Sequence, residues 1–532
     1  MENNNIYGNQ PYAQYGGTAG VPTYQPLMPK VLNAFKPDIS DFIFAVAAFA
    51  LGYLFSRWVY FAWQGWGVAA FTTAYLLVVT AYMMIKGTYL KSRAAFFWLS
   101  ITWLTGVSFA LWSNMGFNGI RSIFLFCSAV YYILISSGNA IMGKTGNYLL
   151  IDGFMAVIII PFRNFFNQYV SFSVLGKEGK NRKALSALIG AAVALILAAI
   201  LIPMLESADS GGFGMIMASL RNIFNINPYE VMWYALFAIP VAAYLYGLVS
   251  GVAHKKGTDI IKPESATKTA AAMRILQPTT VFVVLGSVLF IYLVFIFSQI
   301  PYFFSALAGA RPKDWLVYSE YARRGFFELC GIVLINLLVL TICNITSKKP
   351  RKESKMLKAF NISLAVITLV LIATAFSKMA LYIDAYGLTM LRLLPCVFMV
   401  FLAIAFFALI ALQRFDFSIV RFLLITGAVF LCVLSLGNPD ALVVRYNADR
   451  YMSGSLPGYD MEIVRRAGDA GILPTIEVYD KTSETYLKTE IEWYLNSCSS
   501  WQLDSNANRV SLESHLAREA LASVDFTHPR LD

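Results

Sequence analysis

Residues 138–145 are the first place to look for chemistry, because their types match a nucleotide-binding motif. The sequence GNAIMGKT fits the G-x-x-x-x-G-K-[ST] spacing of the P-loop, whose backbone N–H groups surround phosphates. That loop needs a buried strand before it and a helix after it. Here a long apolar segment precedes the motif, and Asp152 and Pro161 interrupt the apolar residues after it. We therefore expect a glycine turn at a helix end, with Lys144 near lipid headgroups.

Three segments, 318–329, 381–392 and 438–451, combine tyrosine, arginine and acidic residues at predicted membrane boundaries. Such residues commonly serve as interfacial anchors. The alternative is that the segments converge into an outer-face platform that holds an anionic lipid headgroup or a glycan phosphate through arginine. The candidate residues of this polar platform are Glu320, Arg323, Arg324, Glu328, Tyr382, Asp384, Tyr386, Arg392, Arg445, Tyr446, Asn447 and Arg450.

Cysteine and histidine are too scattered in the sequence to suggest a metal or cofactor site. Five of the six cysteines lie singly in apolar segments, and Cys498 is alone in the C-terminal region. No apolar segment carries carboxylates or histidines through its middle, as a proton relay would. We expect no catalytic residue, no metal and no cofactor.

The composition identifies the setting of these residues as a membrane. Of 532 residues, 58% are hydrophobic and only 14% are charged, with a mean hydropathy of +0.60. Soluble proteins have about 45–50% apolar and about 25% charged residues. The chain is therefore not expected to be a soluble nucleic-acid binder, in spite of its net charge of +11.

Apolar runs long enough to cross roughly 30 Å of hydrocarbon predict about eleven transmembrane helices. The stretch at 147–162 is too short and too interrupted, so it is predicted to be interfacial or re-entrant. The fold class is therefore all-α, a polytopic helical membrane protein. The predicted spans lie near 41–60, 66–85, 94–112, 121–137, 184–204, 231–251, 279–300, 327–345, 358–377, 391–412 and 417–436.

The distribution of Lys and Arg predicts the orientation. With the N-terminus inside, 24 basic residues fall on inward connections and nine on outward ones. Residues after 437 carry nine basic and 15 acidic residues, so the preceding part of the chain has a charge of +17. The excess positive charge then faces anionic lipid on the cytoplasmic side.

The two ends of the chain differ from the apolar region at 41–436. Residues 1–40 are polar and rich in Asn, Tyr, Gly and Pro, which predicts a disordered cytoplasmic tail that a protein partner could bind. Asn438 and Asp460 are predicted helix caps within 437–532, where apolar residues recur at helical spacing. We expect a small extracytoplasmic helical domain that docks on the membrane part.

The three mixed segments also carry a resemblance to known sequences. The residues leading to Gly-Phe-Phe-Glu-Leu, the Tyr-Gly-Leu-Thr-x-Leu-Arg segment and the Asn-Pro-Asp helix with Arg-Tyr-Asn are similar to those of uncharacterised bacterial polytopic membrane proteins. These are the domain-of-unknown-function families four-one-five-three and four-one-seven-three. The resemblance covers most of 40–530. It implies a bacterial cytoplasmic membrane location and supplies no activity.

Three hypotheses for the function follow from the sequence. The absence of a catalytic constellation favours a non-enzymatic scaffold or envelope sensor. The number of spans permits a transporter of a small or lipid-like substrate, although no inverted repeat is evident. The third hypothesis is a membrane-interface transferase with Asp384 or Glu320 as a base beside the arginines.

Overall fold

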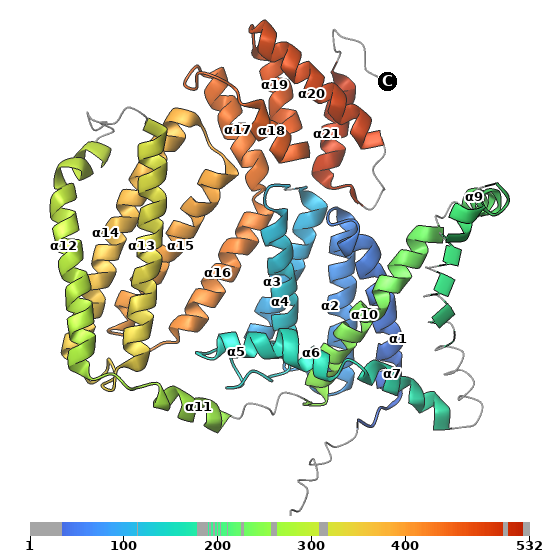
Figure 1. Ribbon diagram of the computed structural model, residues 1–532, viewed down its shortest axis with the longest axis horizontal. Coiled ribbons are helices and arrows are strands. Elements are labelled where there is room, and N and C mark those ends of the chain that lie inside the picture. The colour runs from blue at the N-terminus through green and yellow to red at the C-terminus, as the bar shows by residue number, and fades with distance from the viewer. Residues whose placement is uncertain are drawn as a thin grey trace, which may run out of the picture. The chain divides into compact units, whose positions relative to one another are not determined.

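The computed structural model is helical throughout the part of the chain that it describes (Figure 1). One isolated bridge, between Leu276 and Ser347, is the only extended pairing among those residues. The all-helical prediction is therefore confirmed. The described residues are 35–113, 115–177, 211–224, 228–256, 263–307, 318–503 and 509–524, with short stretches between 190 and 209.

Ten described helices are long and apolar enough to cross a membrane, and a bent pair raises the number to eleven if it forms one span. They coincide with ten of the eleven predicted spans; the span predicted at 184–204 lies largely outside the described residues. The chain is thus a multi-pass membrane protein. The ten are α1 with η1 (Ile39–Phe55 and Ser56–Tyr60), α2 (Trp66–Ile85), α3 (Arg93–Leu111), α4 (Asn118–Ser136), α10 (Pro228–Ala253), α12 (Pro278–Leu307), α13 (Tyr318–Thr346), α14 (Lys355–Tyr386), α15 (Met390–Leu412) and α16 (Ile419–Leu436).

The stretch predicted to be interfacial or re-entrant is helical without interruption from Leu149 to Arg163, and the chain bends after it. It forms α5 (Leu149–Phe154), η2 (Met155–Ile159) and α6 (Ile160–Arg163), and then bends by 50° into α7 (Asn167–Ser171) and η3 (Phe172–Lys177). Figure 1 shows α5 and α6 running across the direction of α3 and α4. The pair is a broken span or a re-entrant loop, so its interfacial placement stays a prediction.

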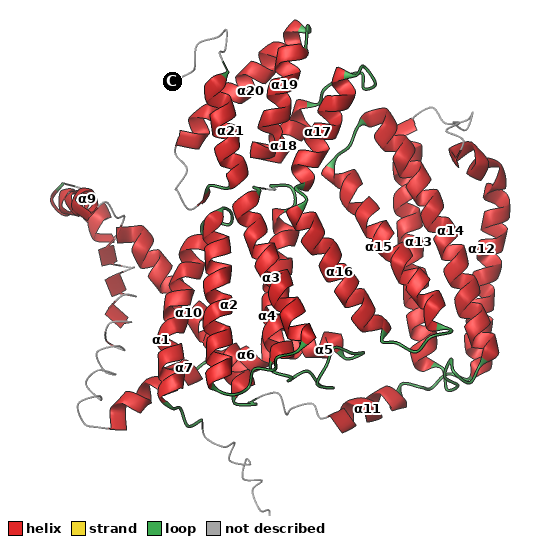
Figure 2. Cartoon of the chain, turned by 180° about the vertical axis from the view of Figure 1, so that it is seen from behind, coloured by secondary structure: helices red, strands yellow, loops and turns green. Residues whose placement is uncertain are grey.

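The membrane helices pack in two groups (Figures 1 and 2). In the first group, α1 packs mainly on α10, α2 packs on α3, and α3 packs on α4. In the second group, α14 contacts α12, α13 and α15 around a continuous apolar core that includes Phe326, Leu364 and Phe406. Helix α16 contacts α3 and α15 and so links the groups. The helices α9 (Gly212–Phe224) and α11 (Pro263–Ala272) are shorter and more peripheral.

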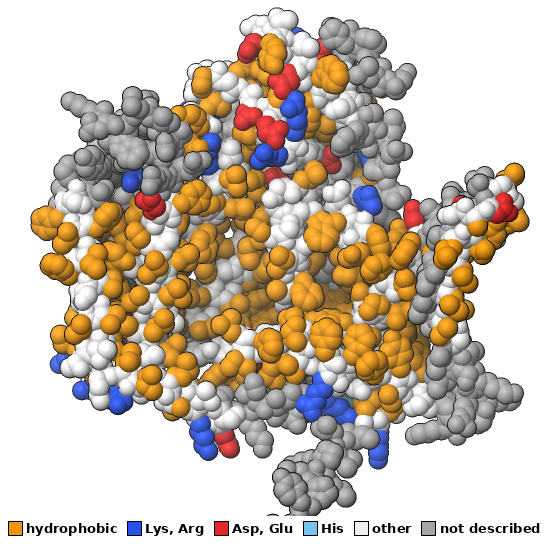
Figure 3. Space-filling view, in the orientation of Figure 1, with side chains coloured by type: hydrophobic (Ala, Val, Ile, Leu, Met, Phe, Trp, Pro, Cys, Tyr) orange, Lys and Arg blue, Asp and Glu red, His pale blue; other side chains and the backbone are white. Residues whose placement is uncertain are grey.

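Hydrophobic side chains form a broad band across the visible face of both groups (Figure 3). Lys and Arg gather along one edge of this band, and acidic together with basic side chains lie on the C-terminal helices beyond the other edge. This is the pattern expected when apolar side chains face lipid and ionised groups stay in the polar layers.

The C-terminal helices form a bundle with an apolar core of its own. Val464, Ile472, Val478 and Leu495 are almost completely buried in this core. Asn438 and Asp460 accept hydrogen bonds from the first turns of their helices, so both predicted caps are confirmed. This C-terminal bundle consists of α17 (Pro439–Met452), α18 (Met461–Ala467), η4 (Gly468–Gly471), α19 (Ile472–Lys481), α20 (Thr485–Leu503) and α21 (Leu512–Ser523).

Small residues allow the closest helix contacts of the first group. A Cβ atom at Gly247 of α10 would overlap the carbonyl oxygen of Pro161, and one at Gly251 would overlap the Asn164 side chain. Small residues commonly permit such backbone approaches between membrane helices. Gly247 and Gly251 therefore set the position of α6 against α10.

Substitution of Gly247 by leucine is expected to destabilise the protein. The new side chain must displace α6, and overpacking of this kind costs about 1–3 kcal/mol. The measurement is the thermal unfolding midpoint of purified protein in detergent. Gly331→Leu is the matched control, because a Cβ atom at this helical position meets nothing within 4 Å. Equal midpoints for the two variants would contradict the packing argument.

Candidate functional site

A buried arginine lies where the C-terminal bundle meets the membrane helices. Arg121, in the first turns of α4, is completely buried, and its guanidinium lies 3.8 Å from the centre of the Phe109 ring. Its Nη atoms donate to three backbone carbonyls and one side-chain oxygen at 2.7–3.2 Å, those of Ser108, Trp112, Ser113 and Asn118. The α3–α4 connection thus wraps around the cation, as a buried charge requires.

Two buried carboxylates from the C-terminal bundle approach the same connection. Glu513, in the first turn of α21, accepts bonds from the Ser113 N–H and hydroxyl at 3.0 and 2.8 Å, and from the Asn438 amide at 2.5 Å. Asp440, in the first turn of α17, accepts a 2.9 Å bond from the Gly116 N–H. We call this set the Arg121 junction; its members are Ser113, Gly116, Asn118, Arg121, Asn438, Asp440 and Glu513.

Burial controls the ionisation of both junction carboxylates. Desolvation raises the pKa of Asp440 from 3.8 to about 6, and the Glu513 charge adds to the rise; the Gly116 hydrogen bond and Arg121 oppose it. Desolvation also raises the pKa of Glu513. Both residues lie at helix N-termini, where the dipole favours a negative charge. Loss of water on burial is nevertheless the largest influence on the pKa of both groups.

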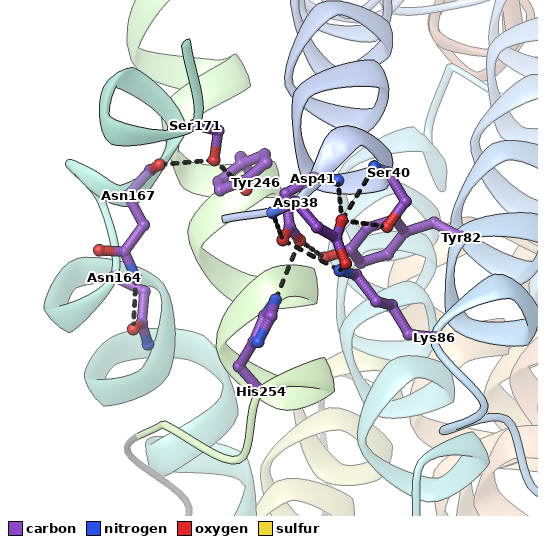
Figure 4. Close-up of polar contacts among 10 residues, drawn as sticks. All are labelled: Asp38, Ser40, Asp41, Tyr82, Lys86, Asn164, Asn167, Ser171, Tyr246 and His254. Carbon is purple, nitrogen blue, oxygen red and sulfur yellow. Dashed lines mark hydrogen bonds and ion pairs between the residues drawn. The ribbon is translucent and has the colours of Figure 1, made fainter. Parts of the chain in front are cut away.

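A second buried polar cluster joins α1, α2 and α10 (Figure 4). Asp41, in the first turn of α1, is completely buried. Its carboxylate contacts three side chains at 2.6–2.9 Å, the hydroxyl of Tyr82, Nε2 of His254 and Nζ of Lys86. Lys86 also lies 2.7 Å from the Asp38 carboxylate. We call Asp38, Asp41, Tyr82, Lys86 and His254 the Asp41 cluster.

The Asp41 cluster fixes the beginning of α1. Asp38 and Asp41 form a capping box, in which each side chain accepts from the backbone of the other. The Lys86 side chain is only 10% exposed, whereas the side chains of His254 and Asp38 are 24% and 61% exposed. The cluster therefore opens to solvent on one side while Asp41 itself stays covered.

Further polar contacts extend from this cluster between α1, α7 and α10 (Figure 4). The hydroxyls of Ser171 and Tyr246 lie 2.5 Å apart, and the Gln168 side-chain amide donates to the Ala45 carbonyl. The Tyr246 ring also lies against Phe44, which stacks on Tyr82. These contacts bind α7 to the same end of α1 that Asp41 holds.

The Arg121 junction and the Asp41 cluster lie at opposite ends of one pair of helices. Helix α4 begins beside the junction and runs for about 28 Å to Ser136. It is bonded to α2 by the Thr80 and Tyr132 hydroxyls at 2.6 Å and by Tyr75, which donates to the Ala129 carbonyl.

The far end of α4 is tied to the segment that carries Lys86. The Leu90 N–H donates to the Ser136 carbonyl at 2.6 Å, and the Ser136 hydroxyl lies 3.7 Å from the sulfur of Met83 in α2. Leu90 follows Lys86 by only four positions in the sequence. A displacement of α4 along its axis would therefore shift Leu90 and Met83, which lie close in sequence to Lys86 of the Asp41 cluster.

The structure brings two of the three predicted platform segments together. The Arg450 guanidinium lies 3.0 Å from the Asp384 carboxylate, and Asn447 bonds to both backbone groups of Leu388 at 2.7 Å. Arg392 lies 4.1 Å from the Tyr382 ring centre and donates to the carbonyls that end α14. A cavity of about 180 Å³ lies beside these contacts, lined by Tyr386, Asn447, Asp460 and neighbouring apolar residues.

The remaining platform residues lie away from these contacts or outside the described residues. Arg445 pairs with Asp449 and Glu477 on the surface of the C-terminal bundle, and Tyr446 accepts a bond from Arg450. Glu328 is exposed on α13. The side chains of Glu320, Arg323 and Arg324 lie outside the described residues. The three arginines with described side chains already bond to protein groups, so binding of an anion here stays a prediction.

The P-loop-like segment forms a turn after a helix, as expected. Gly138 and Gly143 adopt positive φ angles of 68° and 67°, and the segment follows α4 directly. The Ile141 N–H donates to the Asp152 carboxylate at 2.8 Å. This backbone N–H of the segment is thus bonded to a carboxylate of the chain itself.

Sequence reasoning does not identify the two buried clusters. It treats Lys86 and Arg121 only as charges that report orientation, and it gives Asp41 and His254 no role. The available signals are local: Asp38 and Asp41 have capping-box spacing, and Arg121 follows Asn118 by three residues at the start of a span. Neither signal reveals which distant residues complete a cluster.

The Asp41–Lys86 pair is expected to be strongly coupled in stability. Asp41→Asn leaves a nearly buried ammonium with fewer partners, a loss that costs about 3–5 kcal/mol for fully buried pairs. The free energy of unfolding in mixed micelles should fall for Asp41→Asn and for Lys86→Met, and the double variant should lose about 1–3 kcal/mol less than the sum. Glu462→Gln, at an exposed pair with Arg466, is the control and should change stability by less than about 1 kcal/mol. Additive losses would contradict the coupling.

The family of the chain follows from comparison with known sequences. Residues 99–477 match the family described as "Domain of unknown function (DUF4153)". Neither a curated protein nor a solved structure matches the chain. The matched region includes Arg121, Asp440 and the helices between them, and it covers more than half of the chain. The chain belongs to the DUF4153 family.

Proposed function

We propose that this protein is a non-enzymatic envelope sensor of the bacterial cytoplasmic membrane. In this proposal the N-terminus is cytoplasmic, the C-terminal bundle is extracytoplasmic, and the bundle reports to the cytoplasmic side through α4 and α2. The orientation is supported by the 24 basic residues on inward connections against nine on outward ones. The observation that carries the proposal is the Arg121 junction, because it joins the bundle to the helix that leads to the Asp41 cluster.

In this proposal the C-terminal bundle moves as a unit. Its apolar core is formed largely by its own helices. Its attachment to the membrane helices includes buried polar bonds, such as those from Ser113 to Glu513 and from Gly116 to Asp440. Buried ion networks are poor sources of stability, and registry or switching is their best-attested use. The junction is therefore suited to two discrete arrangements of the bundle.

A change at the junction has a structural route to the other side. Arg121 holds the start of α4 to the α3–α4 connection, so release of the bundle alters the constraints on α4. Helix α4 bonds to α2 through Tyr132 and Thr80, and α2 ends with Tyr82 and Lys86 of the Asp41 cluster. Coupling between distant sites is carried by packed helices and bonded networks of this kind.

In this proposal the output is a change at the N-terminal tail, which precedes α1. The Asp41 cluster determines whether the first turn of α1 is held against α2 and α10. The polar tail of residues 1–36 directly precedes this turn in sequence. In the proposal, the tail binds a cytoplasmic protein, and release of Asp41 changes the availability of the tail. An anionic headgroup or glycan at the polar platform would be a further input on the outer side.

The test replaces Arg121 and follows hydrogen exchange at both ends of the protein. Arg121→Met removes the cation but keeps an unbranched side chain in the apolar site beside Phe109. We expect faster exchange at residues 113–121 and 438–444. The sensor proposal requires an additional change of about fivefold or more at 38–45 and 82–90, where a factor of five corresponds to about 1 kcal/mol.

The control for this experiment is Arg445→Met, which removes an exposed ion pair of the same bundle. It should leave exchange at 38–45 and 82–90 unchanged. Glu513→Gln provides a second junction variant in case Arg121→Met does not fold. If both junction variants loosen the bundle and neither affects the Asp41 cluster, the bundle is merely anchored and the sensor proposal fails.

A transporter is the second candidate, and the Asp41 cluster is the observation that favours it. An ionisable residue buried within a predicted span commonly marks an ion or substrate pathway. Proteoliposomes that move protons or a small solute, and lose this activity on Asp41→Asn, would replace the sensor proposal. The transferase hypothesis has less support, because its candidate base Asp384 already pairs with Arg450.

A further inference from the structure

We propose that the Arg121 junction is a proton-binding site, at which a proton taken up by Asp440 strengthens the docking of the C-terminal bundle on the membrane helices. This inference rests on the proposed sensor function and names its input as external acidity. A proton is the ligand that the junction favours, because its buried carboxylates, Asp440 and Glu513, outnumber its buried cation, Arg121.

The buried charges around Asp440 are unbalanced in favour of acids. Arg121 of α4 is the cation of the junction, and its described hydrogen bonds go to carbonyl and amide oxygens. Glu513 of α21 places a second negative charge near Asp440. When Asp440 and Glu513 are both ionised, the two buried carboxylates of the junction outnumber its one buried guanidinium, that of Arg121. One added proton lowers this excess.

The environment of the Asp440 carboxyl group itself also opposes ionisation. The residue is only 2% exposed, and its described hydrogen bond comes from the Gly116 N–H. A Cβ atom at Gly116 would lie 2.6 Å from Asp440 Oδ1, so the backbone of the α3–α4 connection covers this oxygen closely. Little water can therefore solvate the charge. The neutral acid suits this site better than the carboxylate, whereas an undocked bundle would expose Asp440 to water.

The direction of the pH effect follows from the two ionisation states. Burial raises the pKa of Asp440 from 3.8 to about 6, so the docked state binds a proton more tightly than an exposed carboxyl group. A group that binds protons more tightly in one state stabilises that state as the pH falls. Docking should therefore weaken as the pH rises from about 4 to about 6, and should change little above that range. Between pH 5 and pH 7.5 the docking equilibrium should change about tenfold.

The experiment measures hydrogen exchange of the full-length protein at pH 5 and at pH 7.5, corrected for intrinsic exchange at each pH. Protection of residues 113–118 and 439–444 should be about tenfold higher at pH 5. Asp440→Asn keeps an oxygen that can accept from Gly116 but does not titrate. This variant should show equal protection at both pH values. The control Asp449→Asn, at an exposed acid of the same helix, should keep the tenfold difference.

Two results would overturn the inference: wild-type protection that is independent of pH, or a pH dependence that persists in Asp440→Asn. If Asp440→Asn fails to fold, the inference can be tested on the wild-type protein instead. Infrared difference spectra of the wild-type protein should show a buried carboxyl group that gains a proton between pH 7.5 and pH 5. Higher protection at pH 5 without this carboxyl signal would also overturn the inference.

Failure of this inference is distinguishable from failure of the sensor proposal. If protection is independent of pH while Arg121→Met still changes exchange at 38–45, the proton input is wrong and the sensor stands. If protection follows the pH but Arg121→Met has no effect beyond the junction, the site binds a proton and the sensor proposal is wrong.

Discussion

A charged side chain that leaves water must acquire partners, and this constraint determines how the ends of the membrane helices are connected. Arg121 and Asp41 are both completely buried, and each is surrounded by groups from several segments of the chain. Arg121 draws the α3–α4 connection around its guanidinium, and the neighbouring Ser113 and Gly116 bind the first turns of α21 and α17. Asp41 gathers α1, α2 and α10 in the same way. The apolar faces allow these helices to pack, and the buried charges define which helix ends must meet.

The helices were predictable from sequence because each span depends on a local property. Twenty consecutive apolar residues are sufficient to predict a membrane helix, and ten predicted spans coincide with described helices. The bend after Arg163 was not predicted, because Asp152 and Pro161, which interrupt the apolar run in sequence, lie within the continuous helical segment Leu149–Arg163. Helix α14 is longer than predicted, because its last turns carry polar residues that a hydropathy criterion does not count. In these turns Tyr382 contacts Arg392 of α15, and Asp384 pairs with Arg450 of the C-terminal bundle.

The buried clusters were not predictable because their members are far apart in sequence. Asp41 and His254 are separated by 213 positions, and Ser113 and Glu513 by 400. A single Asp or Arg near a span end has the same local sequence whether it faces solvent or a partner. The polar platform illustrates the opposite error. Its composition predicted one anion-binding site, yet Arg392 and Arg450 bond to the end of α14 and to Asp384.

The two clusters differ in a way that bears on their roles. In the Asp41 cluster, the Lys86 ammonium lies 2.9 Å from the Asp41 carboxylate, so opposite charges compensate each other at contact distance. In the Arg121 junction, the guanidinium bonds to backbone carbonyls, and Glu513 and Asp440 accept from neutral donors. A cluster with direct charge pairing resists changes in protonation, because neutralising one partner leaves the other unpaired. A junction whose acids have no direct cationic partner among the described residues responds to protonation with a change in stability. The first arrangement suits a fixed attachment at the start of α1. The second suits a site that responds to pH where the C-terminal bundle docks.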